Sequence, residues 1–217
     1  MKLYNSPGSP NALRARSVLF ELDLPAEIVT LNIGTGENRT PDYLAINPNG
    51  KVPTLVDGDL VVWESRAITS YLSSKKPERD LYPSDPARRA KVDQWSYWQA
   101  IHLGPAMQRV AFERVQKKGF GRGEPDEATI AAELKTVAEL LPILDHALAG
   151  KQWIADTLSV ADFALATTFT LRKSAKLGVD AHANVSAWIE RLEATPGWQK
   201  AIATWREMMQ QRGMPVG

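Results

Sequence analysis

The chain has 217 residues and no cysteine, and its 26 Lys and Arg residues nearly balance its 25 Asp and Glu residues. That length fits one large domain or two small ones and suffices for a sizeable core. The lack of cysteine in the sequence excludes disulfides, thiolate metal sites and any enzyme whose own thiol is the nucleophile. A net charge of only +1 argues against binding nucleic acid or a membrane surface through bulk charge.

The first residues of the chain hold no long apolar run of the kind found in signal peptides. The longest apolar runs elsewhere are too short to span a bilayer. We therefore expect a cytoplasmic protein without membrane or nucleic-acid partners. The three histidines are scattered, so no metal site is expected either.

Residues 1–76 alternate between short strands and helices. The sequence Asp57-Gly58-Asp59 between two apolar runs is a strong signal for a hairpin. The predicted order is β-α-β-α-β-β-α, in which a right-handed crossover joins a parallel pair and the closing hairpin adds antiparallel strands. This half is predicted to be a thioredoxin-like domain, with strands at 2–4, 27–33, 54–56 and 60–62 and helices at 11–22, after Pro41 and at 65–74.

Residues 77–86 contain three prolines and several charges, and we interpret them as a linker without helix or strand. The pattern beyond it, residues 87–217, is helical throughout and contains six of the seven Trp residues. Gly104-Pro105 is expected to kink or break the first of these helices. The further predicted helices are 127–149, 160–176, 184–194 and 197–211.

A helix start is predicted at Ser159-Val160-Ala161-Asp162, which is related to the capping box. Leu158 and Phe163 occupy the positions of its hydrophobic staple. We interpret Ser159 and Asp162 as a device that begins a helix, in preference to a catalytic pair.

Three motifs occur in register along the chain: N-P-N-G-K-V-P-T-L at 47–55, W-E-S-R-A-I at 63–68 and S-V-A-D-F at 159–163. Together with the two-part pattern of the chain, they resemble the soluble glutathione S-transferases over nearly the whole length. The resemblance is to serine-type members with a bacterial-like pattern. It implies a thioredoxin-like α/β domain followed by an all-helical domain, and a homodimer.

The resemblance also implies a glutathione site. The Val52–Pro53 bond is expected to be cis, an isomer that X-Pro bonds adopt at little cost, which turns the Val52 backbone toward the cysteinyl part of glutathione. Glu64 would bind the γ-glutamyl ammonium, and Ser65 at the start of a helix would bind the carboxylate. Arg66 would add a charged contact or serve the dimer interface. In simpler interpretations, Pro53 only begins an edge strand and Ser65 only caps its helix.

Two further cations are candidates for the glycyl carboxylate of glutathione. Lys51 precedes Val52 in the motif and fits this contact by analogy. Arg39 lies in the loop where the family often places another glycyl contact. Both side chains could also simply be solvated.

The reaction needs a group that lowers the pKa of the glutathione thiol. Ser9 matches the position of the catalytic hydroxyl in serine-type members, although Arg14 lies one residue further on than in those classes. Asn11 is the second candidate, through its amide N–H. Ser6 is possible, and Tyr4 resembles the tyrosine-type position only loosely. Ser9 and Asn11 could instead serve as turn or helix-cap residues.

The electrophile is expected between the two halves, since ligand pockets favour such boundaries. The candidates are Trp98, His102, Met107 and Phe112, each of which could equally be a core residue. We predict a glutathione transferase that attacks small hydrophobic electrophiles with glutathione as co-substrate. The alternatives are a glutathione-dependent peroxidase, dehalogenase or lyase on the same site, or a non-catalytic binding, carrier or regulatory protein. Without cysteine in the sequence, disulfide reduction and zeta-type isomerisation are disfavoured.

Overall fold

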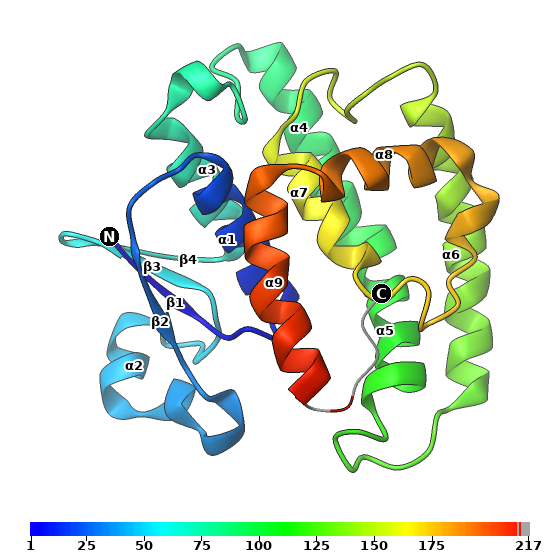
Figure 1. Ribbon diagram of the computed structural model, residues 1–217, viewed down its shortest axis with the longest axis horizontal. Coiled ribbons are helices and arrows are strands. Elements are labelled where there is room, and N and C mark those ends of the chain that lie inside the picture. Colours follow the sequence, from blue (N-terminus) through cyan, green and yellow to red (C-terminus); the bar gives the residue numbers. More distant parts are fainter. Residues whose placement is uncertain (212, 214–217) are drawn as a thin grey trace.

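The computed structural model describes residues 1–211 and 213. Its N-terminal part contains one sheet with the strand order β2-β1-β3-β4. Strand β1 runs parallel to β2 and antiparallel to β3, and β3 is antiparallel to β4. The predicted mixed sheet is therefore confirmed (Figure 1), with β1 (Lys2–Asn5), β2 (Glu27–Thr30), β3 (Thr54–Asp57), β4 (Leu60–Trp63), α1 (Pro10–Glu21), α2 (Pro41–Ile46) and α3 (Ser65–Ser74).

The predicted hairpin joins β3 to β4. Asp57 pairs with Leu60, so Gly58 and Asp59 form the turn. Gly58 has φ +59°, a conformation that glycine adopts without steric cost.

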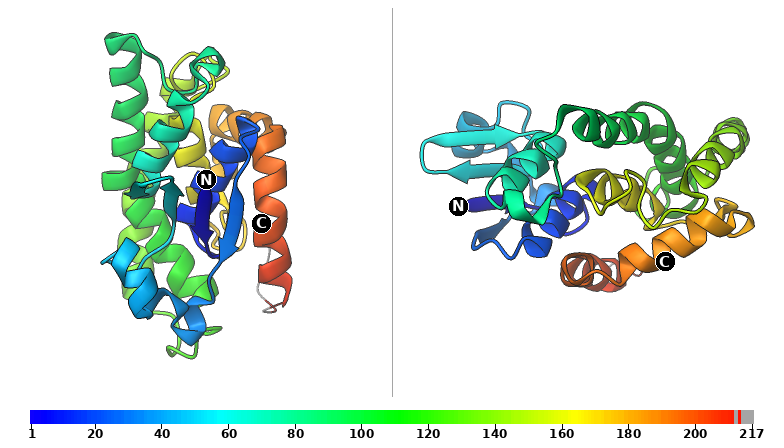
Figure 2. Two further views of the ribbon diagram at one scale, coloured as in Figure 1. Left: turned by 90° about the vertical axis from the view of Figure 1, so that its left-hand side faces the viewer. Right: turned by 90° about the horizontal axis from the view of Figure 1, so that it is seen from above.

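The two faces of the sheet carry different helices, because successive side chains of a strand alternate between faces. Leu3 and Leu55 are fully buried in the main core together with residues of α1 and α3. Tyr4 lies on the opposite face, where its ring meets Tyr43 of α2 edge-on at 5.5 Å. Figure 2 shows this α/β part beside the helical part of the molecule.

The second strand is shorter than the predicted 27–33, because β2 ends at Thr30. The side chain of Asn32 accepts a hydrogen bond from the Gly34 N–H at 3.0 Å. This local contact turns the chain into two short 3₁₀ helices, Ile33–Thr35 and Glu37–Arg39.

The segment predicted as a linker contains one short 3₁₀ helix, Pro77–Arg79, and its last residue begins the next helix. Leu81 in this segment is buried, and its carbonyl accepts the N–H of Val160 at 2.9 Å. The helices that follow are α4 (Pro86–Trp98), α5 (Gly104–Ala111), α6 (Glu127–Leu148), α7 (Val160–Ala166), α8 (Ala183–Glu193) and α9 (Pro196–Gln211). Residues 212 and 214–217 of the predicted helical domain lie outside the described residues.

The helix does not break at Gly104-Pro105. A π-helical turn, Gln99–Leu103, carries the chain from α4 directly into α5, and a second one, Phe112–Gln116, follows α5. A Cβ on Gly104 would lie only 2.6 Å from the Gln99 carbonyl oxygen, so the turn requires glycine at this position. The wider π-helical turn accommodates Pro105, which a regular α-helix would not tolerate in its interior.

The predicted helix 160–176 also ends early, since α7 stops at Ala166 and is followed by a 3₁₀ helix, Thr167–Phe169. Helix α7 begins at the predicted capping box. The Asp162 carboxylate accepts hydrogen bonds from the N–H and Oγ of Ser159 at 2.9 and 2.8 Å. It also accepts from the Ile154 N–H and from Nε1 of Trp188, which confirms a structural role inside the core.

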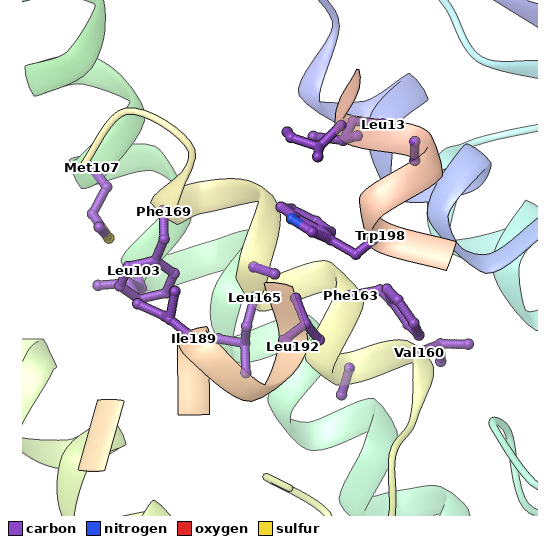
Figure 3. Close-up of a cluster of buried hydrophobic side chains, with 14 of the residues drawn as sticks. Leu13, Leu103, Met107, Val160, Phe163, Leu165, Phe169, Ile189, Leu192 and Trp198 are labelled. Atoms are coloured by element: carbon purple, nitrogen blue, oxygen red, sulfur yellow. The ribbon is translucent and has the colours of Figure 1, made fainter. Parts of the chain in front are cut away.

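The two halves share one core, which Figure 3 shows with Leu13 of α1, Phe163 of α7 and Trp198 of α9. Helix α9 lies along α1 (Figure 1). Gly197 of α9 lies against the end of α1, because a Cβ at this position would be only 2.5 Å from the Glu21 backbone nitrogen. Nη2 of Arg16 on α1 also donates to the Ala201 carbonyl of α9 at 3.1 Å. This packing fixes the α/β half against the helical half and so fixes the boundary between them.

Candidate functional site

The motif loop before β3 is held by side-chain hydrogen bonds to its backbone. Nδ2 of Asn47 donates to the Lys51 carbonyl at 2.8 Å and to Oγ1 of Thr54 at 2.9 Å. The hydroxyl of Tyr43 donates to the same carbonyl at 2.6 Å. The Val52–Pro53 bond at the end of this loop is cis, as the resemblance implied.

A small cavity of about 40 Å³ opens beside this loop. It brings together five of the residues predicted to bind glutathione with Asn11 at the start of α1, although they come from three separate parts of the chain. Its lining consists of Asn11, Asn47, Asn49, Lys51, Val52, Pro53, Glu64 and Ser65.

The join between β4 and α3 has an unusual backbone. Glu64 has φ +71°, a region that non-glycine residues rarely occupy and that costs about 1–3 kcal/mol. Such outliers cluster at ligand sites. Ser65 is the first residue of α3, and the N-cap position belongs to Glu64, so the predicted capping role of Ser65 is wrong. Its Oγ instead accepts a hydrogen bond from Nη1 of Arg14 at 2.6 Å.

The two predicted thiol-activating residues lie at the N-terminal end of α1. Ser9 is the N-cap of α1, and its Oγ accepts the Ala12 N–H at 3.3 Å. Asn11 is exposed in the first turn, and its Oδ1 accepts from Nη1 of Arg14 at 2.8 Å. Because the amide oxygen is engaged, the NH₂ group is the part of Asn11 left to donate to a ligand.

Arg14 is the residue that sequence reasoning missed. Its side chain is only 3% exposed, and its described partners are the neutral oxygens of Asn11, Ser65 and Thr167. Its Nε is buried without a partner. Burial, reinforced by the nearby positive charge of Arg66 and opposed by Glu64, lowers the pKa of Arg14 to about 9. The available signal was the spacing Asn11-x-x-Arg14, which puts both side chains on one helix face.

A larger cavity of about 350 Å³ lies between the two halves. The start of α1 forms one wall together with Arg66, and the other walls are formed by residues 99–120 and by the segment after α7. Asn11 lines both this cavity and the small one. The lining of the larger cavity is Gly8, Pro10, Asn11, Arg14, Arg66, Gln99, Ala100, Gly104, Pro105, Gln108, Ala111, Gln116, Phe120, Thr167, Thr168, Thr170 and Leu171.

Arg66 points to the helical half rather than to solvent. Its Nε donates to the carbonyl and Oγ of Ser96, both at 3.2 Å, and its Nη2 donates to Oε1 of Gln99. Nε2 of Gln99 donates in turn to Oγ1 of Thr168 at 2.9 Å. Burial lowers the pKa of Arg66, and the charge of Glu64 opposes that shift.

The four residues predicted for the electrophile do not line the larger cavity. Met107 is fully buried in the main core. The ring of Trp98 packs edge-on against that of Trp95, with 5.2 Å between the ring centroids. His102 is exposed. Phe112 lies beneath the guanidinium of Arg122 at 6.0 Å. These four side chains do not line the cavity, whereas small and amide-bearing residues of the same part of the chain, together with Phe120, do.

The two predicted glycyl contacts are both exposed. Lys51 lines the small cavity. Arg39 does not, but its Nη1 would lie 2.7 Å from a Cβ on Gly50, so it covers the outer side of the same loop.

Across residues 1–211 and 213, no three His, Asp or Glu side chains gather as a metal site would require. None of the helices in that part of the chain combines the length and apolarity needed to cross a membrane.

Fold and site together define a two-part protein with a small cavity on its α/β domain and a second, larger cavity between that domain and the helical half. Comparison with known proteins identifies the class. The glutathione S-transferase N-terminal domain matches residues 1–74, and the glutathione S-transferase C-terminal domain matches residues 98–196.

Individual relatives agree with these matches. Glutathione S-transferase 3 of Zea mays is 37% identical over 209 residues, covering 94% of this chain and 93% of the relative. Glutathione S-transferase GstB of Escherichia coli is 32% identical over 203 residues, covering 92% and 96%. The structure of maize glutathione S-transferase I in complex with an atrazine glutathione conjugate superposes with a TM-score of 0.87, at 30% identity, covering 94% and 97%.

The chain therefore belongs to the glutathione S-transferase family. This confirms the predicted fold and the prediction of a transferase with glutathione as co-substrate.

Proposed function

We propose that this chain conjugates glutathione to an electrophile at the wall shared by the two cavities. The observation that carries the proposal is the position of Asn11, which lines both the small cavity and the larger one. A thiol bound in the first cavity would meet an electrophile bound in the second beside the N-terminal end of α1. Holding both reactants in this way is itself a large part of catalysis.

Glutathione occupies the small cavity in this proposal. The backbone of Val52 pairs with its cysteinyl part, and Lys51 attracts the glycyl carboxylate. Glu64 binds the γ-glutamyl ammonium, and the backbone N–H groups at the start of α3, with Ser65, receive the carboxylate. The strained backbone of Glu64, with φ +71°, supports a ligand-binding role because such strain is rarely kept without a function.

Ser9 and Asn11 stabilise the thiolate. An unperturbed thiol has a pKa of about 8.5, and lowering it by about two units corresponds to about 2.7 kcal/mol of preferential thiolate binding. A hydrogen bond from the Ser9 hydroxyl or the Asn11 amide supplies part of this preference. The partial positive charge at the N-terminus of α1 supplies more. The buried cation of Arg14 adds to the same field, since its Nη1 contacts Asn11 directly.

A cytoplasmic homodimer is the second part of the proposal. Tyr97 and Ile101 are 56% and 66% exposed on the helical run from α4, and Trp63 is 42% exposed at the end of β4. Large apolar side chains on a surface favour burial by a partner. Light scattering should give a molar mass of two chains for wild type. The Ile101→Asp variant should have the molar mass of one chain. A wild-type protein of one chain mass contradicts this part.

Two assays test the proposal: capture of the protein on immobilised glutathione, and conjugation of glutathione to a nitro-substituted aryl halide. Wild type should bind glutathione and conjugate the halide. Ser9→Ala and Asn11→Ala should still bind glutathione but conjugate the halide more slowly. Binding without turnover in wild type would favour a carrier or regulatory protein. Full activity in one variant would remove that residue from its role.

A further inference from the structure

The residues of the helical half that line the larger cavity follow a helical spacing with one longer step. Gly104, Gln108 and Ala111 lie four and three residues apart, as expected for one face of an α-helix. The next lining residue, Gln116, comes five positions after Ala111, and Phe120 follows four positions later. The face that lines the cavity is therefore shifted by one residue between Ala111 and Gln116.

This shift coincides with the second π-helical turn. In that turn the Lys117 N–H donates to the Phe112 carbonyl at 2.8 Å, five residues back instead of the four of an α-helix. The Phe120 N–H then donates to the Gln116 carbonyl at 3.0 Å, so these two residues are one α-helical turn apart. One residue corresponds to about 100° around a helix. Without the π-helical turn, Phe120 would be rotated away from the cavity that it lines.

The chain turns directly after Phe120 and holds it in place. The Arg122 N–H donates to the Lys117 carbonyl at 3.0 Å. The Gly121 N–H donates to the Lys118 carbonyl, also at 3.0 Å. Gly121 has φ +66°, and this pair of bonds around a left-handed glycine is the pattern of the Schellman motif. The backbone on both sides of Phe120 is therefore fixed by hydrogen bonds.

The loop that carries Phe120 joins α5 to α6 (Figure 1) and is closed at its base by Glu113. This side chain is 9% exposed. Its Oε2 accepts hydrogen bonds from Nζ of Lys117 at 2.7 Å and from the Asp126 N–H at 2.8 Å. Asp126 is in turn the N-cap of α6. One carboxylate thus ties the two ends of the loop together, with Phe120 between them.

Phe120 contributes a feature that the rest of the cavity lacks. It is the one aromatic side chain among the described residues that line the cavity, and it is 47% exposed. An exposed apolar ring on a cavity wall gains free energy when a ligand covers it. A second ring gains more than its area alone supplies, through stacked or edge-on contact. The other apolar side chains of the lining are Pro10, Ala100, Pro105, Ala111 and Leu171.

We propose that Phe120 is a specificity-determining residue, whose ring packs against the ring of an aromatic electrophile bound in the larger cavity. This proposal rests on the proposed function and deepens it by naming the substrate class that Phe120 selects. With an aryl halide, the glutathione thiolate forms the S–C bond at the ring carbon, and the halide leaves with the bonding pair. Phe120 takes no part in these bond changes and acts by contact with the substrate alone.

The test compares an aryl electrophile, chlorodinitrobenzene, with a small alkyl electrophile, iodomethane. Each kcat/KM is divided by the uncatalysed rate constant with glutathione, because the two compounds differ in reactivity. The variants are Phe120→Ala, Phe120→Leu and Phe120→Tyr. The matched control is Ile143→Ala, which removes an exposed apolar side chain of α6 that does not line the cavity.

Phe120→Ala should lower the normalised kcat/KM for chlorodinitrobenzene by about tenfold and that for iodomethane by less than about twofold. Phe120→Leu should lose part of the aryl activity, because it keeps apolar contact without the ring. Phe120→Tyr and Ile143→Ala should behave as wild type. Equal losses for both electrophiles would assign Phe120 a structural role and overturn the proposal. Unchanged aryl activity in Phe120→Ala would also overturn it, and both results leave the proposed function intact.

A wild-type protein that conjugates neither electrophile would instead count against the proposed function. Binding of the dinitrophenyl conjugate of glutathione and of S-methylglutathione, measured by calorimetry, then decides the role of Phe120. Tighter binding of the dinitrophenyl conjugate that is lost in Phe120→Ala and kept in Phe120→Tyr supports the proposal without turnover. Equal binding of the two conjugates, or binding of neither, contradicts it.

Discussion

Nη1 of Arg14 donates a hydrogen bond to Oγ of Ser65 across 2.6 Å and ties the first turn of α3 to the second turn of α1. The same nitrogen donates to Oδ1 of Asn11 at 2.8 Å. One buried guanidinium therefore sets the relative position of the proposed thiol site and the proposed γ-glutamyl site. Nη2 extends this link to Thr167 in the helical half, at 3.1 Å.

Arg14→Lys should impair both stability and catalysis. A single ammonium cannot reach three oxygens as a planar guanidinium does, so Asn11 and Ser65 lose their common anchor. We expect kcat/KM to fall by about tenfold to a hundredfold through misplaced reactants. The free energy of unfolding should fall by about 1–3 kcal/mol, measured in urea. Arg109→Lys is the exposed control, and wild-type kinetics in Arg14→Lys would contradict the anchoring role.

Ser9→Ala separates helix capping from catalysis. Loss of the cap should lower the free energy of unfolding by about 1 kcal/mol. Asp85→Ala removes the cap of α4, whose Oδ1 accepts the Arg88 N–H at 2.8 Å, and should cost a similar amount. Only Ser9→Ala should also reduce turnover. If both variants retain the same turnover, Ser9 acts as a cap alone.

Glu64→Gly tests the γ-glutamyl contact without confounding stability. Glycine adopts φ +71° readily, so the variant should unfold no more easily than wild type. Loss of the carboxylate should nevertheless raise KM for glutathione by about tenfold, since charge-assisted contacts are strong. Glu37→Gly, at an exposed position in the 3₁₀ helix Glu37–Arg39, should leave this KM unchanged. An unchanged KM in Glu64→Gly would refute the assignment.

Asp162→Asn should destabilise the fold severely. Four donors surround the carboxylate, and an amide would turn its own NH₂ toward at least one of them. Although burial raises the pKa of Asp162, the hydrogen bonds favour the charged form. We expect a loss of about 3–5 kcal/mol in urea unfolding, as for other broken buried charge networks. A loss below that of the exposed control Asp180→Asn would show that the carboxylate is dispensable.

Local signals in the sequence predicted local structure well. The turn Asp57-Gly58-Asp59 and the box Ser159-Val160-Ala161-Asp162 depend on hydrogen bonds between near neighbours, so a few residues determine them. The motif at 47–55, through the resemblance that it carries, predicted the position of the cis bond. The same motif contains five of the residues that line the small cavity.

Structural features that depend on contacts between distant parts of the chain could not be predicted from the sequence pattern. The chain passes Gly104-Pro105 as a π turn, in which Gln99 also contacts Arg66 and Thr168 from other elements. The polar face toward the larger cavity was missed because large apolar residues of the same helices, such as Met107, were chosen instead. Arg14 was missed because two of its three partners, Ser65 and Thr167, lie far from it in the sequence.

The pKa of the glutathione thiol in the complex tests the central claim most directly. It can be measured by titrating the ultraviolet absorbance of the bound thiolate in wild type, Ser9→Ala and Asn11→Ala. The account predicts a wild-type value about two units below the ordinary thiol pKa of about 8.5, and a return toward that value in at least one variant. A bound thiol that titrates like the free one, or a lowered pKa unchanged in both variants, would contradict thiolate stabilisation at the start of α1.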